Sequence, residues 1–332
     1  MIFMWLKFFV SAGLVVFAGV KLTKYADIIS DRFSISKAWV GMILLGVATS
    51  LPELTATIAS AVGLNAPNLA VGNIAGSVNF NLMIIVVLDF LYRKGSITGQ
   101  IQSKKTYEWS AAFYAVLSLI VVLEIFFASK ARLIGIGSVS LGNILIVGIY
   151  ILSSKYIFKV DSDQQAVESV RHKITKDDQV LFIKIVLGAG AVILGGIWLA
   201  DVCDKIAIVT GLGRTFVGTM LLGFVTSLPE IVVSVSALRM GALDLAFGNI
   251  FGSNMFNILI LSICEMTYAK GFLFENVSKA HIMMMTLSVV LTTILIAGIK
   301  KGKKKEFLGF GIDSILMIIC FAIGMNFLYH LK

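Results

Sequence analysis

The chain has 332 residues, of which 58% are apolar and only 14% are charged, and its mean hydropathy is +0.94. A soluble domain carries about 25% charged residues. This composition, with its apolar residues in long blocks, therefore excludes an ordinary soluble protein and predicts an integral membrane protein. The formal net charge of +9 does not indicate nucleic-acid binding, because the basic residues cluster in the loops between the blocks.

Ten apolar blocks follow one another along the chain. The first has no basic run ahead of it, so we interpret it as a span and not as a signal peptide. Five blocks precede the polar stretch Ser154–Gln179 and five follow it, which predicts repeats at 1–153 and 180–332 joined by a linker at 154–179. We expect transmembrane helices at about 3–20, 38–62, 69–91, 107–128, 133–153, 180–199, 215–238, 244–268, 280–299 and 309–329.

Two short patterns occur once in each half. A-T-S-L-P-E at 48–53 matches V-T-S-L-P-E at 225–230, and G-N-I-A-G-S-V-N-F-N at 72–81 matches G-N-I-F-G-S-N-M-F-N at 248–257. Five spans separate the two copies of each pattern. Because five is odd, the copies run in opposite directions through the membrane. The sequence therefore predicts an all-α membrane protein whose ten helices form two inverted-topology five-helix repeats, as in many secondary transporters.

The basic residues predict the orientation. Most of the 28 Lys and Arg residues lie in the loops after the first, third, fifth, seventh and ninth spans, with Lys184 at the foot of a span. This side is expected to be cytoplasmic, together with the linker 154–179, and both termini are then extracytoplasmic. We interpret the lysine run at 300–305 as a topology anchor, which is favoured over a specific anionic-lipid site.

The first pattern places a carboxylate within each of two apolar spans. Glu53 shares a helix face with Thr49 and Ser50, which lie four and three residues earlier. The same spacing recurs at Thr226, Ser227 and Glu230 in the second copy. A charged side chain at the bilayer centre costs about 3 kcal/mol, and two would repel each other unless cations or protons lay between them.

The proline of each pattern, at 52 and 229, removes a backbone donor and frees the carbonyl four residues earlier, which a bound cation could satisfy. The motifs supply only oxygen ligands, and their two glutamates contribute two negative charges, which favours a hard cation such as Ca²⁺ or Na⁺. The motifs contain no Cys or His for zinc or copper.

The second pattern places polar side chains at every fourth position. On the two helices these stripes are Asn73, Ser77 and Asn81, and Asn249, Ser253 and Asn257. A G-x-x-x-G pair, at 72 and 76 or at 248 and 252, interleaves with each stripe and lets helices approach closely. The outermost asparagines of the stripes could instead serve only as interhelical hydrogen-bonding groups.

Further acids lie outside the motifs. Asp89 and Glu265 occupy equivalent positions near span ends, so we expect solvated rim acids, with a role at the ion entrances as the weaker alternative. Glu124 and Asp313 have no equivalent partner, and we interpret them as interface residues. The three histidines and three cysteines are assigned no chemistry.

These patterns resemble the calcium/cation antiporter superfamily and, within it, the sodium/calcium exchanger branch of prokaryotic type. The likeness covers both motif copies and nearly the whole chain. It implies a sodium/calcium antiporter that moves Ca²⁺ out of the cell, driven by Na⁺ entry, by alternating access in which the first and sixth spans move past the core. It also implies that Glu53 and Glu230 are the central calcium ligands.

The resemblance implies further ion-binding groups. They are the hydroxyls of Thr49, Ser50, Ser77, Thr226, Ser227 and Ser253, the last motif positions Asn81 and Asn257, and the backbone carbonyls of Gly46 and Gly223. Asn at both last positions argues against potassium co-transport. The chain departs from the family's pattern at Val78, where Asn is common, and at Val225, where a small residue is usual.

Other functions fit less well. A proton-coupled calcium/cation exchanger of the same fold is the first alternative. A cation channel usually repeats its filter about the membrane normal, and an enzyme would need a nucleophile–base pair that the motifs do not offer. We therefore expect a transporter in the cell membrane that needs no cofactor, with Na⁺, Ca²⁺ and lipid as its partners and no obligatory protein partner.

Overall fold

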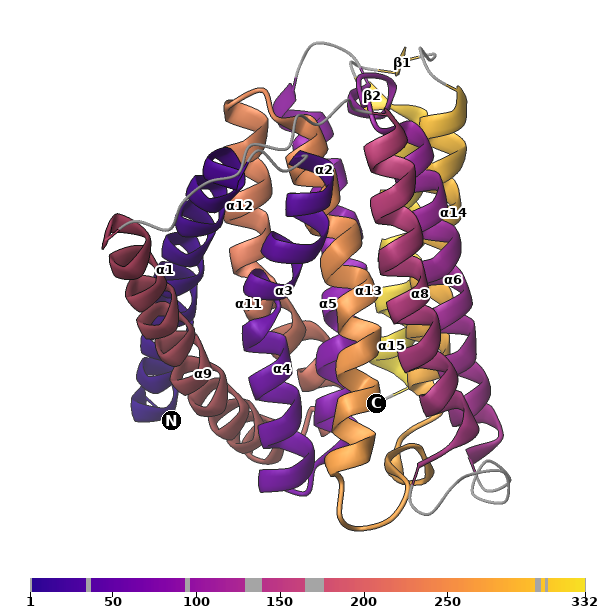
Figure 1. The fold of residues 1–332 in the computed structure, drawn as a ribbon. Coiled ribbons are helices and arrows are strands. Elements are labelled where there is room, and N and C mark those ends of the chain that lie inside the picture. The colour runs from indigo at the N-terminus through magenta and orange to yellow at the C-terminus, as the bar shows by residue number, and fades with distance from the viewer. Residues whose placement is uncertain are drawn as a thin grey trace.

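Ten membrane-length helical segments build the molecule, seen as a ribbon in Figure 1. The structure is a computed structural model, and it describes residues 2–33, 37–92, 96–128, 139–164, 176–301, 306–307 and 310–331. Within these residues, ten helical segments are long and apolar enough to cross a membrane. The prediction of an all-helical protein with ten spans is therefore confirmed.

The first half contains five of these segments. Its elements are α1 (Ile2–Phe33), α2 (Lys37–Trp39), the π-helix η1 (Val40–Leu45), α3 (Gly46–Thr49), α4 (Leu51–Ile58), the π-helix η2 (Ala59–Gly63), α5 (Pro67–Tyr92), the 3₁₀ turn η3 (Ile97–Gly99), α6 (Lys104–Phe126) and α8 (Leu141–Gln164).

The second half contains the other five. Its elements are α9 (Lys176–Thr210), α10 (Arg214–Val217), the π-helix η5 (Gly218–Leu222), α11 (Gly223–Thr226), α12 (Leu228–Arg239), α13 (Leu243–Thr267), the 3₁₀ turn η6 (Leu273–Asn276), α14 (Ala280–Lys301), the strands β1 (Glu306–Phe307) and β2 (Phe310–Gly311), and α15 (Ile312–His330). The two strands form a small antiparallel hairpin that the sequence did not predict.

The two halves run in opposite directions. In Figure 1, α1 rises from the N-terminus at the lower end, whereas its equivalent α9 descends. Both termini are marked toward the lower end, whereas α8 ends and α9 begins toward the opposite, upper end. This arrangement is the inverted-topology repeat that the sequence predicts.

The helices α5 and α13 form the centre of the molecule. About 72% of the α5 span and 89% of the α13 span is buried inside the protein, against 33% for the first span and 22% for the sixth. Each central helix packs against the broken span of the other half, α13 on η1 and α5 on η5. Glycines allow this approach: a Cβ on Gly218 would lie 2.7 Å from the carbonyl oxygen of Leu69.

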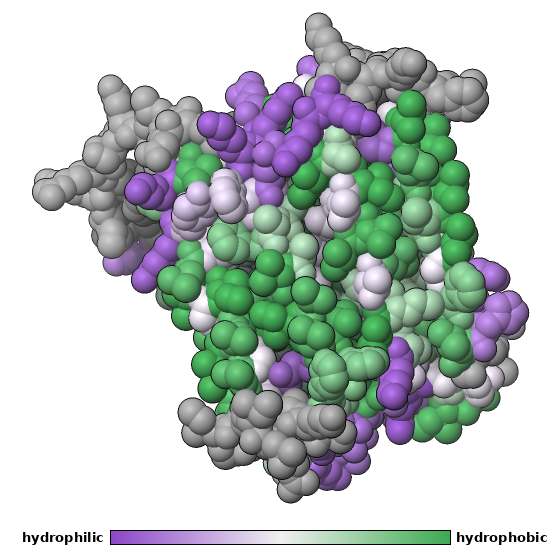
Figure 2. Space-filling view, turned by 90° about the vertical axis from the view of Figure 1, so that its right-hand side faces the viewer, coloured by the Kyte–Doolittle hydropathy of each residue, from purple (hydrophilic) through white to green (hydrophobic). Residues whose placement is uncertain are grey.

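The outer surface suits a bilayer. Figure 2 shows a hydrophobic band across the middle of one face, with hydrophilic residues gathered toward its upper and lower ends. Exposed apolar side chains lie along the outer helices, including Phe9, Leu187 and Phe327. In lipid such side chains need no protein partner, which accounts for their exposure.

Several helices are longer than predicted. The first runs to Phe33 and not to about residue 20, and α9 spans Lys176–Thr210 and not 180–199. Helix α8 continues to Gln164, so both flanking helices extend into the range 154–179 that was predicted as a linker. A hydropathy window marks only the part of a helix inside the hydrocarbon core, about 20 residues, whereas polar residues such as Lys and Asp continue the helix into water.

Candidate ion site

Each motif span is a broken helix, and the break positions its glutamate. Helix α3 ends at Thr49 and α4 begins at Leu51, with Ser50 between them outside helical geometry (φ −87°, ψ 9°). The equivalent break lies at Ser227 (φ −83°, ψ 1°). The proline follows in the first turn of each new helix, where its missing N–H costs nothing. The glutamate thus lies in the first turn, at the positive end of the helix dipole.

A π-helix precedes each break. It covers Val40–Leu45 in the first half and Gly218–Leu222 in the second. π-helical turns are rare and often occur at functional sites. Their repetition at equivalent places, together with the breaks, shows that both motif spans depart from regular α-helix where the carboxylates are held.

The two carboxylates are fully buried, and each receives a hydroxyl from the other half. Ser227 Oγ donates to Glu53 Oε1 at 3.3 Å, and Ser50 Oγ donates to Glu230 Oε1 at 3.1 Å. Ser253 Oγ also donates to Glu230 Oε1, at 3.4 Å. The inverted repeat therefore brings Glu53, Ser227, Ser50 and Glu230 into a single site between the halves.

The motif threonines and glycine carbonyls surround these carboxylates. Thr49 lies 3.2 Å from Ser253, and Thr226 lies 3.3 Å from Ser77, measured between their hydroxyl oxygens. Ser253 donates to the Gly46 carbonyl at 3.3 Å, and Ser77 donates to the Gly223 carbonyl at 3.2 Å. The carbonyls of Gly46 and Gly223 therefore lie among the motif hydroxyls.

Glycine is required at both of these positions. A Cβ on Gly46 would lie 2.8 Å from the backbone nitrogen of Ser253, and one on Gly223 would lie 3.0 Å from that of Ser77. Any larger residue would push α13 or α5 away from the broken spans. The glycines thus bring the carbonyls and the serine hydroxyls together.

Several buried polar atoms of the site have no hydrogen-bond partner among the described residues. They are Glu53 Oε2, Glu230 Oε2, Asn81 Oδ1 and both side-chain heteroatoms of Asn257. Buried polar atoms are nearly always satisfied, so these atoms indicate that the motif side chains bind water or an ion. Oxygen donors with two acids and no soft ligand fit a hard cation. Across the described residues, no three His, Cys, Asp or Glu side chains lie together.

The outermost asparagines of the stripes make hydrogen bonds between helices. Asn73 Nδ2 donates to Thr57 Oγ1 at 3.0 Å, and its Oδ1 accepts from Thr226 at 3.1 Å. Asn249 Nδ2 donates to Ser234 at 3.3 Å, and its Oδ1 accepts from Thr49 at 3.1 Å. Both side chains therefore hold the motif threonines Thr226 and Thr49 through interhelical hydrogen bonds.

Asn254 is a residue of the site that sequence reasoning missed. Its Oδ1 accepts from Asn81 Nδ2 at 3.1 Å, and its Nδ2 donates to the carbonyl of Val78 at 3.2 Å. The signal was present, because Asn254 is the equivalent of Val78, at which the motif departs from the family's pattern. Asn254 orients the Asn81 amide, which leaves Asn81 Oδ1 for a ligand.

The prediction of solvated rim acids is wrong for Asp89 and Glu265, since each side chain is only 2% exposed. Asp89 accepts hydrogen bonds from the backbone of Ile97 and Gly311 and from Ser314 Oγ. The turn after α5 and the start of α15 fold over it and exclude water. Both carboxylate oxygens of Glu265 lack a hydrogen-bond partner among the described residues.

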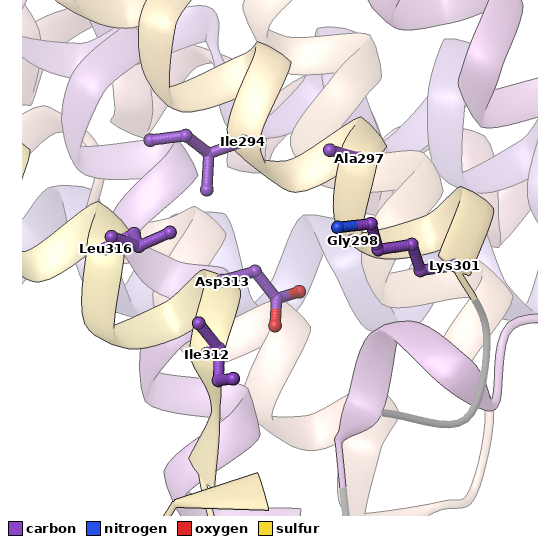
Figure 3. A pocket seen from close by; sticks show the side chains of 7 residues that line it. All are labelled: Ile294, Ala297, Gly298, Lys301, Ile312, Asp313 and Leu316. Atoms are coloured by element: carbon purple, nitrogen blue, oxygen red, sulfur yellow. The ribbon is translucent and has the colours of Figure 1, made fainter. Parts of the chain in front are cut away.

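Glu124 and Asp313 lie at helix interfaces, as predicted. Glu124 Oε1 accepts from the backbone of Gly142 at 3.1 Å, and Asp313 Oδ2 accepts from Thr98 Oγ1 at 3.0 Å. Asp313 also borders a cavity of about 320 Å³ between α14 and α15, shown in Figure 3 with Lys301 on the facing helix. No lining residue of this cavity belongs to the carboxylate site.

Comparison with known proteins identifies a family whose sequence model matches most of the chain. A sequence model of the family described as "Sodium/calcium exchanger protein" matches residues 3–159 and 180–329. The "Sodium/calcium exchanger MaX1" of Methanosarcina acetivorans is 26% identical and aligns over 83% of this chain and 86% of its own length. The "Uncharacterized membrane protein MJ0091" of Methanocaldococcus jannaschii is 24% identical over 90% of both chains.

Solved structures show the same fold. The sodium-calcium exchanger NCX_Mj matches with a TM-score of 0.67 at 20% identity, over 98% of both chains. A second structure of that exchanger matches with a TM-score of 0.65 over 99% of this chain. These matches confirm the fold of ten helices in two inverted repeats.

Proposed function

Since this chain belongs to the sodium/calcium exchanger protein family, we propose that it is an antiporter that moves Ca²⁺ out of the cell in exchange for Na⁺ entry. Its family and fold are those of a transporter. The relatives named as sodium/calcium exchangers support these two ions as the cargo. The observation that carries the proposal is the set of buried, unpartnered oxygens contributed by Glu53, Glu230 and Asn81.

The binding groups have distinct roles in this proposal. Glu53 and Glu230 hold Ca²⁺ between the halves, and Asn81 and Asn257 complete its oxygen shell. The carbonyls of Gly46 and Gly223 and the motif hydroxyls also bind Na⁺. The hydroxyl contributors are Thr49, Ser50, Ser77, Thr226, Ser227 and Ser253. Because Na⁺ and Ca²⁺ compete for the same oxygens, they bind in turn.

Coupling follows from the burial of the two acids. An empty site with both carboxylates ionised holds like charges away from water, which is costly in a low-dielectric interior. A bound Ca²⁺ or several Na⁺ ions offset that charge. Only the loaded protein can then pass cheaply through an occluded state, so the two ions are exchanged and not leaked.

We further propose that the protein lies in the cell membrane with both termini outside and the connection between α8 and α9 in the cytoplasm. The 28 basic residues gather mostly on that side. The carried ions are the only bound groups that the site needs, so no cofactor is required, and lipid is the surrounding partner without an obligatory protein subunit.

Uptake of ⁴⁵Ca²⁺ into proteoliposomes tests the proposal. Vesicles loaded with Na⁺ are diluted into Na⁺-free buffer, and K⁺-loaded vesicles serve as the control. Uptake that requires internal Na⁺ is the expected result. Uptake driven by a proton gradient without Na⁺ would replace the proposal by the proton-coupled alternative, and currents far above carrier rates would favour a channel.

A further inference from the structure

Helices α1 and α9 form a pair at the edge of the molecule. Lys7 Nζ on α1 lies 2.6 Å from Asp201 Oδ2 on α9, and a Cβ on Gly195 would lie 2.6 Å from Cγ2 of Val15. The pair packs along its length, and both helices lie together at one side of Figure 1. Their spans are also among the least buried of the ten.

One glycine of each helix lies directly against a motif proline. A Cβ on Gly19 of α1 would lie 2.8 Å from Cβ and 3.0 Å from Cγ of Pro229. A Cβ on Gly196 of α9 would clash with Thr55 Oγ1 and lie 3.2 Å from the carbonyl oxygen of Pro52. Each proline immediately precedes a carboxylate of the site, so the two glycines mark where the pair crosses the ion-binding helices.

The two contacts are equivalent under the inverted repeat. Gly196 follows Gly19 by 177 positions, and Glu230 follows Glu53 by the same number. The pairing is crossed: Gly19 of the first half lies against Pro229 of the second half, and Gly196 of the second half lies against Pro52 of the first half. Glycine inside a helix costs up to about 1 kcal/mol relative to alanine, so its presence at both places indicates that the close crossing is needed.

We propose that Gly19 and Gly196 are positioning residues for transport. Because they have no side chain, the α1/α9 pair can move past the two motif prolines when the ion site switches from one side of the membrane to the other. This proposal rests on the proposed antiport. An added Cβ on Gly19 would meet Pro229, and one on Gly196 would meet Thr55 and the carbonyl of Pro52. None of these atoms belongs to a proposed ion ligand, so a side chain there should hinder the movement of the pair and leave ion binding intact. The effect should be larger at Gly19, which faces a rigid proline ring, than at Gly196, which faces a threonine side chain.

The chain supplies matched controls on the same two helices. Gly13 of α1 and Gly190 of α9 have no atom within 4 Å of an added Cβ. We expect Gly19→Ala to lower the maximal rate of ⁴⁵Ca²⁺ uptake by about tenfold or more, and Gly196→Ala to lower it by a smaller factor. Gly13→Ala and Gly190→Ala should keep the wild-type rate. Equilibrium ⁴⁵Ca²⁺ binding in detergent should be unchanged in all four variants.

A second substitution provides a rescue that a general packing defect would not show. Thr55→Ala removes Oγ1, the atom with which the added methyl of Gly196→Ala would clash, and leaves the Cβ of residue 55 at 3.2 Å. The double variant should recover most of the wild-type rate, whereas Thr55→Ala alone should change it little. A loss of rate in the controls equal to that in Gly19→Ala, or weakened Ca²⁺ binding at an unchanged maximal rate, would overturn the proposal.

Spin labels separate this proposal from the identity of the carried ions. Labels replace the exposed residues Phe17 on α1 and Met240 at the end of α12, in a background in which the three native cysteines are alanine. Two distances between the labels are expected in the wild type, with populations that differ between Na⁺ and Ca²⁺ buffers, and one distance in Gly19→Ala. A single unchanging distance in the wild type would overturn the role of the glycines, whereas failure of the antiport appears in the wild-type flux alone.

Discussion

Among the described residues, Glu230 accepts hydrogen bonds from Ser50 and Ser253, whereas its equivalent Glu53 accepts one, from Ser227. Ser253 and its equivalent Ser77 each donate to a glycine carbonyl, and only Ser253 also reaches a carboxylate there. The second motif differs in the same way. The Asn81 amide is held by Asn254, but neither heteroatom of Asn257 has a partner among the described residues. The two halves of the site therefore share a backbone and differ in their hydrogen bonds.

One substitution accounts for the difference around the asparagines. Asn254 fills the position that Val78 occupies in the first half, so only Asn81 has an amide opposite it. A fixed Asn81 is preorganised for a ligand, whereas the Asn257 amide has no hydrogen-bond partner in the described part of the chain and can turn to meet an ion. A two-fold backbone can thus hold a site with one rigid side and one adaptable side, which suits two ions of different charge.

The largest loss of transport is expected when one of the two equivalent carboxylates, Glu53 or Glu230, is neutralised. Glu53→Gln and Glu230→Gln should each reduce Na⁺-dependent ⁴⁵Ca²⁺ uptake by about 100-fold or more, because one carboxylate cannot offset Ca²⁺. Each variant should also raise the ion-free melting temperature, since it removes the repulsion of two buried like charges. Glu275→Gln, in an exposed turn, is the control. Uptake close to wild type in either variant would refute the site.

The next test makes the halves alike. Asn254→Val leaves the Asn81 amide and the carbonyl of Val78 without their partner, which costs about 1–3 kcal/mol and should weaken Ca²⁺ binding about tenfold to 100-fold. Val78→Asn offers Asn257 a partner by symmetry and should weaken binding less. The Ca²⁺ dependence of uptake measures both. Equal affinity in Asn254→Val and the wild type would show that the fixed amide is not needed.

The sequence was sufficient to predict the repeats and the two carboxylates. A glutamate within a long apolar block is a strong local signal, and the recurrence of both patterns in the second half, in the same order, indicates the symmetry. The breaks at the motif prolines were also predictable, because proline removes a backbone donor wherever it occurs in a helix. These features depend on residues close to one another in the chain.

Features that depend on distant residues were not predictable. Asp89 was expected to be solvated, but Gly311 and Ser314, more than 200 positions away, supply its hydrogen bonds. The partner of Asn81 lies 173 positions away in the other half. The position of an acid near a span end does not indicate which distant segment will cover its side chain. The two copies of a motif also look alike in sequence, although their hydrogen bonds differ where Val78 is replaced by Asn254.

Asp89 and Glu265 offer a test of stability at equivalent positions. Asp89→Asn replaces an acceptor by a donor that faces Ile97, Gly311 or Ser314, which should cost about 1.5–3 kcal/mol. Glu265→Gln neutralises a buried acid whose carboxylate oxygens have no hydrogen-bond partner among the described residues, so it should be neutral or stabilising. Thermal unfolding in detergent measures both. A larger loss for Glu265→Gln would mean that its carboxylate has a partner that balances its charge.

The smallest expected difference separates the two motif serines that cross between the halves. Ser50 Oγ donates to Glu230, whereas the single hydroxyl proton of Ser227 is shared between Glu53 at 3.3 Å and the Gly223 carbonyl at 2.9 Å. An undivided hydrogen bond to a carboxylate is the stronger one. Ser50→Ala should therefore weaken ion binding more than Ser227→Ala, by about two- to tenfold against about twofold.

The Na⁺ dependence of ⁴⁵Ca²⁺ release measures these two variants. Ser236→Ala is the control, because that exposed hydroxyl donates to the carbonyl of Val232 in its own helix. A reversed order would identify the Gly223 carbonyl, and not the Glu53 carboxylate, as the main partner of the Ser227 hydroxyl. The asymmetry between the halves would then begin at the first motif, since the equivalent bond from Ser50 goes to a carboxylate.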